Sequence, residues 1–191
     1  MVRNPGDFSS IRIETMLSQL DLATTINRLA SEIANDVADL NPVFVGLLKG
    51  SLIFMSDLIR QLNFPLTTDF LSVSSYQGTT STGLVRILNE VEHPIANRHV
   101  ILVEDIVDSG QTVHHVIAHL RLKNPASIRI CSLLDKTARR LTPVAISYIG
   151  HQFTDGFVVG FGMDYHGYYR NLPYVGIIKG ASENPSAKSD P

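Results

Sequence analysis

The sequence predicts an α/β domain built on a mainly parallel sheet that is flanked by helices. Short apolar runs alternate with helical patterns between residues 21 and 134, and such alternation is typical of a parallel sheet covered by helices. The clearest unit covers residues 99–113. There the apolar run 100–103 leads through acidic residues into a helix over 114–123, with apolar residues at 113, 116, 117 and 120.

The first part of the chain predicts a helix, a strand and a second helix. Apolar residues at 22, 26, 29, 33 and 37 predict a helix over 21–40. Asp21 is the expected N-cap, and Asn41-Pro42 ends the helix. The apolar run 43–48 predicts a buried strand, and residues 51–62 predict the next helix.

A flexible flap is expected beside the parallel strands. Alternating residues predict a strand over 66–75, and residues 84–89 predict another. Between them, residues 76–83 are polar, contain glycine and lack an apolar face, which predicts a mobile loop. We expect the two strands to pair in antiparallel orientation.

The remaining segments complete one domain. Further strands are expected at 128–134, 144–149 and 157–161. Residues 1–17 show no regular pattern and are expected to be irregular. Because we find no repeat or linker, we assign residues 1–180 to a single domain and expect a disordered tail at 181–191.

Composition excludes several classes of protein. A net charge of −2 argues against a chain built mainly to bind nucleic acid. No apolar run reaches membrane-spanning length, and the N-terminus does not resemble a signal peptide. The single Cys131 cannot form an internal disulfide, which fits a cytoplasmic protein, and its apolar neighbours predict a core position.

The loop at 109–112 predicts a phosphate site. A tight loop that opens a helix directs backbone N–H groups outward, and the helix dipole adds partial positive charge. Ser109 and Thr112 can add hydroxyl donors, and Gly110 lets the backbone approach a ligand closely. The alternative is an ordinary strand-to-helix turn with a Ser or Asp cap.

The carboxylates before this loop need a different partner. Glu104 and Asp105 end the apolar run, and Asp108 follows three residues later. Diol hydroxyls and a hydrated divalent cation are natural partners for such carboxylates. The segment therefore has the donors and acceptors that a ribose 5-phosphate requires.

Residues 103–112, Val-Glu-Asp-Ile-Val-Asp-Ser-Gly-Gln-Thr, resemble the 5-phosphoribosyl 1-pyrophosphate (PRPP) motif of type I phosphoribosyltransferases. Asp108 further resembles the branch of that family that acts on 6-oxopurines. Residues 155–165, Asp-Gly-Phe-Val-Val-Gly-Phe-Gly-Met-Asp-Tyr, are a second match. The resemblance implies the type I fold, with a small hood formed by the terminal segments.

The resemblance also implies a reaction. PRPP and hypoxanthine or guanine would give IMP or GMP and pyrophosphate with Mg²⁺, as in purine salvage. Asp108 would be the general base at the N7 side of the purine. Family members are usually homodimers or homotetramers. Two alternatives remain open: a PRPP-sensing regulator of the same fold, and a phosphoribosyltransferase for xanthine.

The resemblance assigns the site residues to four sets. The ribose phosphate would be held by Glu104, Asp105, Asp108, Ser109, Gly110, Gln111 and Thr112. The pyrophosphate would be held by Lys49, Gly50, Ser75, Tyr76 and Arg170. The purine would contact Lys136, Phe157, Val158, Met163 and Asp164. The metal ligands would be Glu104, Asp105 and Asp164.

Three of these roles carry specific expectations. A non-proline cis peptide between Leu48 and Lys49 is expected in the pyrophosphate loop. Lys136 would donate to the exocyclic oxygen of a 6-oxopurine and so reject adenine, the alternative being an ordinary turn lysine. Backbone groups of Val158 and Met163 would contact the purine edge. Gly156 differs from relatives, which often carry a charged residue there.

The histidines at 114, 115 and 119 suggest a metal site by their helical spacing. No Glu or Cys completes such a site, so we expect a solvated face or a subunit contact instead.

Overall fold

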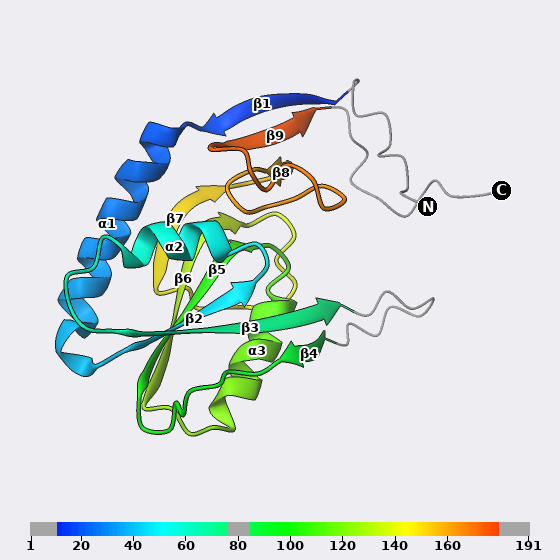
Figure 1. Cartoon of the computed structure of the whole chain (residues 1–191). Coiled ribbons are helices and arrows are strands. Elements are labelled where there is room, and N and C mark those ends of the chain that lie inside the picture. Colours follow the sequence, from blue (N-terminus) through cyan, green and yellow to red (C-terminus); the bar gives the residue numbers. More distant parts are fainter. Residues whose placement is uncertain (1–10, 76–84, 180–191) are drawn as a thin grey trace, which may run out of the picture.

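The chain forms two sheets and three α-helices within residues 11–75 and 85–179, the part that this computed structural model describes (Figure 1). In spatial order, the larger sheet contains β4 (Val85–Asn89), β3 (Thr67–Ser75), β2 (Val43–Leu48), β5 (His99–Val107), β6 (Ser127–Lys136) and β7 (Tyr148–Phe153). Every neighbouring pair is parallel except β3–β4. The mainly parallel sheet and its antiparallel flap strands are confirmed.

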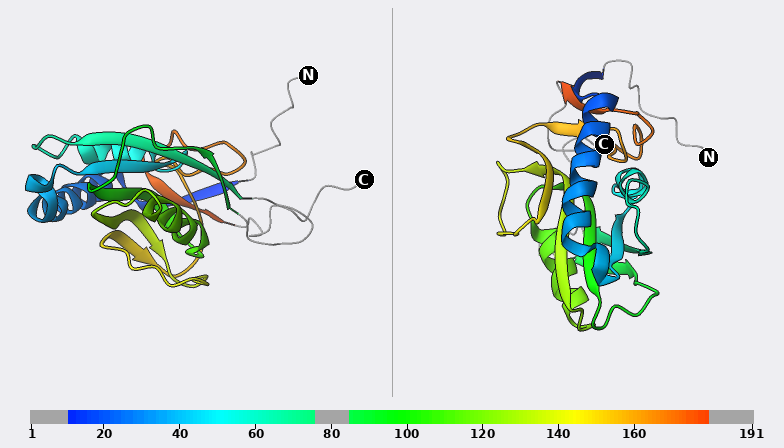
Figure 2. Two further views of the ribbon diagram at one scale, coloured as in Figure 1. Left: turned by 90° about the horizontal axis from the view of Figure 1, so that it is seen from below. Right: turned by 90° about the vertical axis from the view of Figure 1, so that its left-hand side faces the viewer.

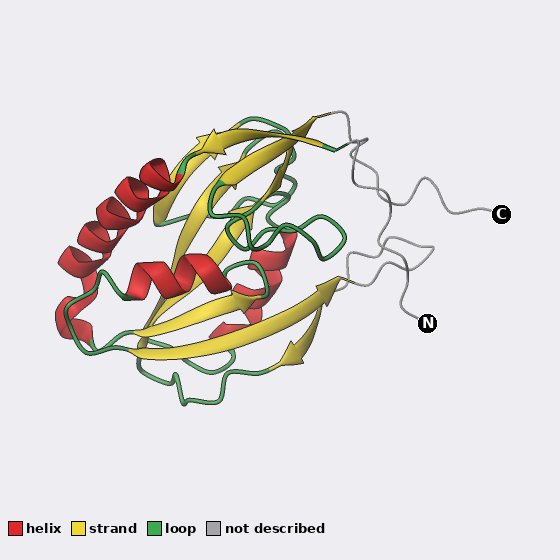
Figure 3. Cartoon of the chain, turned by 45° about the horizontal axis from the view of Figure 1, so that its top comes forward, coloured by secondary structure: helices red, strands yellow, loops and turns green. Residues whose placement is uncertain are grey.

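Helices cover both faces of the larger sheet. α1 (Gln19–Val37) and α2 (Leu52–Ile59) pack on one face, and α3 (Gln111–Arg121) packs on the other (Figure 3). Alternate residues of β5 separate the two cores: Ile101 and Val103 join α1 and α2, whereas Val100 and Leu102 join α3. The buried run predicted for this strand therefore serves two cores.

A smaller sheet forms the hood. Its strand order is β1 (Arg12–Leu17), β9 (Val175–Lys179) and β8 (Phe157–Val159), all antiparallel. α1 connects this sheet to the far end of the larger one (Figure 2). The prediction of an irregular segment at 1–17 was wrong for β1, because its partner β9 lies about 160 residues away and leaves no local signal.

Two element boundaries also differ from the predictions. Ser18, not Asp21, is the N-cap of α1: Asp21 N donates to Ser18 Oγ at 3.2 Å, and Ser18 N donates to Asp21 Oδ2 at 2.8 Å. The last turn, Ala38–Leu40, is a 3₁₀ helix.

The strand predicted at 144–149 begins only at Tyr148 and runs to Phe153; residues 140–142, which precede it, bond to the loop after β5. The strand predicted at 157–161 ends at Val159, where Gly160 turns the chain with φ +92°. α3 begins three residues before the predicted start at 114.

The predicted loop at 76–83 and tail at 181–191 lie outside the described residues. Cys131 is fully buried, as expected, and burial raises the pKa of its thiol. Within the described ranges, no helix has both the length and the hydropathy that a bilayer crossing demands.

Candidate active site

The candidate residues gather where the parallel strands end. Glu104 and Asp105 lie near the carboxyl end of β5, and Lys136 is the last residue of β6. Lys49 and Gly50 follow β2 directly. Since parallel strands place their carboxyl ends at one edge of the sheet, segments far apart in sequence meet there.

A small polar cavity lies at the start of α3. It has a volume of about 90 Å³ and is lined by Glu104, Ile106, Val107, Asp108, Ser109, Gly110, Thr112 and Val113. Gly110 is the N-cap of α3 with φ +82°, and a Cβ there would overlap the carbonyl oxygen of Thr142. Only glycine therefore fits this turn, which exposes the helix start to the cavity as predicted for a phosphate site.

Gln111 differs from its neighbours. It begins α3 and is exposed, and it does not line this cavity. Its backbone N–H lies 3.4 Å from Ser109 Oγ. The predicted contact of Gln111 with the ribose phosphate is not tested by this arrangement and stays a prediction.

Two acidic side chains lie deep beside the cavity. Glu104 is buried, and its Oε2 has no hydrogen-bond partner. Burial and the neighbouring Asp105 raise the pKa of Glu104 well above its usual value. Burial also raises the pKa of Asp105 to about 6, although backbone N–H groups and Arg170 act in the opposite direction. Such carboxylates require a cation or hydroxyl donors to offset their desolvation.

The donor set fits Mg²⁺ only together with a substrate. Carboxylate oxygens are the ligands that Mg²⁺ prefers, and the orphaned Glu104 Oε2 can supply one. Within residues 11–75 and 85–179, no group of three or more acidic, His or Cys side chains could hold a metal alone. Mg²⁺ in proteins commonly takes one or two carboxylates and completes its shell with substrate phosphates and water.

Asp164 is already occupied by protein partners. Arg170 Nη2 lies 2.5 Å from Asp164 Oδ1, and Gly167 N donates to Asp164 Oδ2 at 2.7 Å. Arg170 also donates to the carbonyl of Gly162 at 2.6 Å. A cation at Asp164 would therefore have to share this carboxylate with Arg170.

The loop after β2, predicted to bind pyrophosphate, packs directly on Asp105. The peptide between Leu48 and Lys49 is cis, as predicted. A Cβ at Gly50 would overlap the carboxylate of Asp105, so only glycine permits this approach. The side chain of Lys49 is exposed beside it. Ser75 is the last residue of β3, and Tyr76 lies outside the described residues.

A second cavity adjoins the first and has the size of a small planar ligand. Its volume is about 210 Å³, and its lining consists of Asp105, Ile106, Asp108, Lys136, Gly156, Phe157, Val158, Met163 and Asp164. Asp108 and Ile106 line both cavities. All five predicted purine-contacting residues are present in this lining.

Lys136 is a buried lysine and not a surface turn residue. Its side chain is 5 % exposed, and Nζ lies 3.0 Å from the carbonyl oxygen of Gly156. Nζ also lies 3.2 Å from Asp155 Oδ1 and 3.8 Å from Asp108 Oδ2. Asp108 Oδ1, by contrast, is buried without a partner. The cavity thus offers a ligand the cationic donor of Lys136 and, among its three lining carboxylates, the buried unpartnered oxygen of Asp108.

The apolar wall is formed by Phe157, whose ring contacts Tyr165 edge-to-face with centroids 5.4 Å apart. The predicted role of Met163 needs one correction. Its N–H donates to Gly160 O at 3.1 Å, and its carbonyl accepts from Gly160 N at 3.0 Å. Only the remaining lone pair of that carbonyl can therefore contact a purine edge.

Several contacts of the site were not predicted, although Ile106, Asp155 and Tyr165 lie within the two matched motifs. Ile106 lines both cavities, Asp155 pairs with Lys136, and Tyr165 contacts Phe157. Arg140 donates from Nε to the carbonyl of Asp108 at 2.9 Å. Most of these contacts join residues that are distant in sequence and meet only in the fold. The contact of Tyr165 with Phe157 is the exception, because both aromatic residues lie within 157–165.

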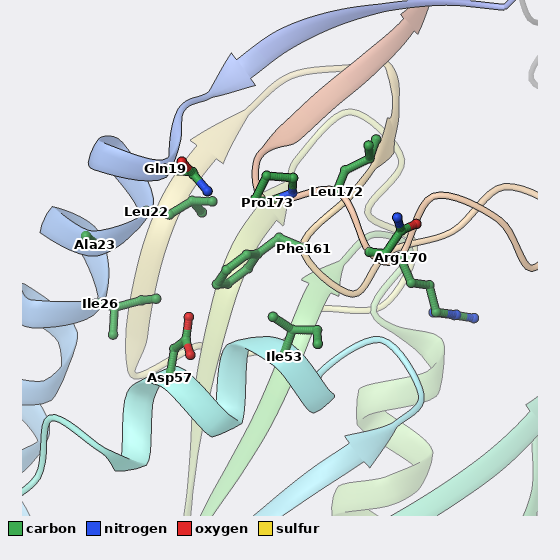
Figure 4. A pocket seen from close by; sticks show the side chains of 11 residues that line it. Gln19, Leu22, Ala23, Ile26, Ile53, Asp57, Phe161, Arg170, Leu172 and Pro173 are labelled. Atoms are coloured by element: carbon green, nitrogen blue, oxygen red, sulfur yellow. The ribbon is translucent and has the colours of Figure 1, made fainter.

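A further cavity of about 360 Å³ lies between α1, α2 and the segment 170–173 (Figure 4). Its wall is mostly apolar and includes Leu22, Ile26 and Phe161. Arg170 contributes to its rim but extends away from the apolar side chains (Figure 4). This cavity therefore does not belong to the predicted substrate site.

The histidines of α3 take part in surface contacts. His119 Nε2 lies 2.8 Å from Glu90 Oε1, and Lys123 lies 3.1 Å from the same carboxylate. His114 and His115 are exposed. The expectation that these histidines lie on a solvated face agrees with this arrangement.

Comparison with known proteins identifies the family. Residues 13–166 match the model of the phosphoribosyl transferase domain. The chain is 38% identical to a hypoxanthine-guanine-xanthine phosphoribosyltransferase of Tritrichomonas foetus, covering 86% of this chain and 90% of that protein. It is 40% identical to a hypoxanthine phosphoribosyltransferase of Haemophilus influenzae, covering 87% and 95%.

Solved structures give the same result. A hypoxanthine-guanine phosphoribosyltransferase of Bacillus anthracis superposes with a TM-score of 0.83 at 38% identity, covering 88% of this chain and 99% of that one. A hypoxanthine phosphoribosyltransferase of Staphylococcus aureus gives a TM-score of 0.84 at 38% identity, covering 93% and 96%. The expected type I fold is confirmed, and this chain belongs to the phosphoribosyltransferase family of enzymes.

Proposed function

We propose that the protein is a purine salvage enzyme that transfers the 5-phosphoribosyl group from PRPP to hypoxanthine or guanine, giving IMP or GMP and pyrophosphate. One observation carries the proposal. A polar cavity at a helix N-terminus and a cavity with an aromatic wall adjoin each other, and Asp108 lines both. A ribose phosphate in the first would place its C1 near a purine in the second.

The sugar phosphate is bound by the loop after β5. Backbone N–H groups near Gly110 and the hydroxyls of Ser109 and Thr112 surround the 5-phosphate, which the dipole of α3 stabilises. Glu104 and Asp105 accept hydrogen bonds from the ribose hydroxyls, which offset the desolvation of the two carboxyls.

The purine is held by its ring face and by its exocyclic oxygen. Phe157 stacks on the ring, and the ammonium of Lys136 donates to the oxygen at position 6. Adenine carries an amino donor at that position, so the buried ammonium would lose its acceptor. The proposal therefore includes discrimination against adenine.

Asp108 holds the proton that leaves the purine. As N9 forms its bond to C1, the bond from C1 to the pyrophosphate oxygen breaks and its electron pair leaves with pyrophosphate. The developing positive charge on the purine is relieved by transfer of the N7 proton to Asp108. The buried, unpartnered Asp108 Oδ1 supports this role.

We also propose Mg²⁺ as the cofactor, held by Glu104 and Asp105 together with substrate oxygens. When bound, Mg²⁺ would stabilise the negative charge on the departing pyrophosphate. Lys49 and Arg170 add positive charge at the same edge, and the guanidinium can bind phosphate oxygens in bidentate fashion. Asp164 keeps Arg170 oriented and is a further candidate ligand.

The choice among 6-oxopurines is part of the proposal. The relatives' names include hypoxanthine, guanine and xanthine. In this proposal the backbone groups of Val158 and Met163, which line the cavity, contact the purine edge, so hypoxanthine and guanine both fit the proposed contacts. We find no observation that favours a PRPP-sensing regulator.

Assembly and location complete the proposal. We propose a homodimer or homotetramer in the cytoplasm. The exposed Leu52 and Ile53 at the start of α2 support a subunit contact beside Lys49. The single buried thiol of Cys131 suits a reducing compartment. Light scattering of the purified protein tests the assembly.

A spectrophotometric assay tests the reaction. The protein is mixed with PRPP and Mg²⁺, and hypoxanthine, guanine, xanthine and adenine are offered separately. Turnover of hypoxanthine or guanine, with adenine inert, supports the proposal. A folded protein that binds PRPP but converts none of the four bases would contradict it.

A further inference from the structure

Three consecutive carbonyls of the phosphate loop accept hydrogen bonds from one distant segment, residues 140–142. Arg140 Nη2 donates to Val107 O at 3.1 Å, and Arg140 Nε donates to Asp108 O at 2.9 Å. The N–H groups of Leu141 and Thr142 both donate to Ser109 O at 3.0 Å. We call residues 140–142 the clasp.

These bonds fix the direction of the loop's N–H groups. In a trans peptide, the carbonyl of one residue and the N–H of the next point in opposite directions. The loop peptides are trans, since Leu48–Lys49 is the one cis bond found in the described part of the chain. The N–H groups of residues 108–110 therefore point away from the clasp, on the side of the cavity that these residues line.

The guanidinium of Arg140 is itself fixed by a buried carboxylate. Its Nη2 pairs with the buried carboxylate of Asp135, which also accepts from Gln152 Nε2 at 3.0 Å. Asp135 lies in β6 and Gln152 in β7, so the guanidinium is anchored to two strands of the sheet. Arg140 lines neither substrate cavity. Its influence on a ligand must act through the loop.

We propose that Arg140 is a positioning residue that presets the phosphate loop, orienting its N–H groups for the sugar phosphate before substrate binds. Asp135 and Gln152 hold its guanidinium in the bridging position. This role of Arg140 rests on the proposed function, because that function identifies the ligand of the loop as a sugar phosphate. Its direct consequence is that Arg140 controls affinity for the sugar phosphate more than affinity for the purine.

The test compares three variants with the wild-type enzyme. Arg140→Lys keeps the charge but cannot bridge two carbonyls and a carboxylate together. Asp135→Asn leaves Arg140 in place and removes the charge that anchors it. Arg121→Lys is the matched control, because Arg121 is exposed at the end of α3 and lies outside both substrate cavities.

Ribose 5-phosphate binding is measured by calorimetry, and steady-state kinetics are measured with PRPP and hypoxanthine. For Arg140→Lys, we expect the Kd for ribose 5-phosphate and the KM for PRPP to rise about tenfold or more. The KM for hypoxanthine should change less than about twofold, since Lys136 and Phe157 are untouched. Asp135→Asn should also weaken ribose 5-phosphate and PRPP binding more than hypoxanthine binding, but to a smaller degree. Arg121→Lys should behave as wild type.

A thermal melt separates positioning from folding. A variant that melts near the wild-type temperature and shows the split supports the inference. Wild-type affinity for ribose 5-phosphate in both Arg140→Lys and Asp135→Asn would overturn it, as would equal losses for both substrates. The calorimetric result stands even if the wild-type protein transfers nothing to purines, so the two proposals fail separately.

Discussion

The ammonium of Lys136 lies 3.8 Å from Oδ2 of Asp108, and both residues line the cavity of about 210 Å³ that is proposed to hold the purine. A donor for the exocyclic oxygen and an acceptor for the N7 proton are therefore neighbours. Positions 6 and 7 are also neighbours on a 6-oxopurine, so one bound base can contact both groups. Asp155 and the Gly156 carbonyl complete the surroundings of the lysine, whose burial requires such partners.

Lys136→Met should remove the contact to the purine oxygen. Because hydrogen bonds from charged groups contribute about 1.5–3 kcal/mol, kcat/KM for hypoxanthine should fall about 10- to 100-fold. The advantage of hypoxanthine over adenine should shrink with it. The control is Lys123→Met, which removes a lysine paired with Glu90 at the surface. Unchanged selectivity in Lys136→Met would show that the lysine does not contact the base.

Asp108→Asn should lose most turnover while largely keeping PRPP binding. An amide cannot take the purine proton, and general base catalysis typically contributes about 10²- to 10⁴-fold. Asp108→Glu keeps a carboxyl group at this position and is measured for comparison with Asp108→Asn. Rapid-quench measurement of the chemical step checks both variants. A kcat near wild type in Asp108→Asn would remove the general-base role.

Gly110→Ala should weaken binding of the sugar phosphate in addition to straining the backbone. The residue has φ +82°, and its Cβ would overlap the carbonyl of Thr142, a residue of the clasp. Gly167 has φ +86° with nothing within 4 Å of its Cβ position, so Gly167→Ala introduces backbone strain without a steric overlap. Each should lose about 1–2 kcal/mol of unfolding free energy from strain. Only Gly110→Ala should also raise the KM for PRPP, by about tenfold or more; equal KM values would contradict the steric argument.

Acid stability should depend on Asp69. Burial raises the pKa of this carboxyl, but N–H donors from His93 and Phe70 outweigh burial and leave the pKa below its usual value. A lowered pKa in the folded state stabilises the protein above the unfolded pKa of about 4, and the contribution disappears as pH falls through the folded value. Urea unfolding between pH 3 and 7 should show this decline.

Asp69→Asn provides the comparison. This substitution should lower the free energy of unfolding by about 1–3 kcal/mol at neutral pH. The reason is that it removes the charge from hydrogen bonds that join β3 to the segment after β4. The cost should become smaller toward pH 3. An equal cost at both ends of the range would exclude Asp69 as the source of the pH dependence.

The larger sheet was predictable because its information is local. The buried runs of β2 and β5 and the helix after Gly110 each follow from a short stretch of sequence. β1 was missed because its pairing partner, β9, lies at the other end of the chain. The bonds of residues 140–142 to the loop after β5 are likewise non-local and were not predicted.

The site shows the same division. Asp108, Lys136 and Phe157 were predictable from the motifs that contain them. Arg140 was not, because its partners Val107 and Asp108 lie more than 30 residues away in sequence. The burial of Glu104 and its unpartnered oxygen likewise depend on packing that no short segment encodes.

We propose that this one chain joins a sugar phosphate to a 6-oxopurine at Asp108. Phosphorus NMR of the wild-type enzyme with PRPP, Mg²⁺ and hypoxanthine follows this reaction. We expect the PRPP signals to be replaced by those of pyrophosphate and a nucleoside monophosphate in equal amounts. Unchanged PRPP, or pyrophosphate and ribose 5-phosphate without any nucleotide, would contradict it.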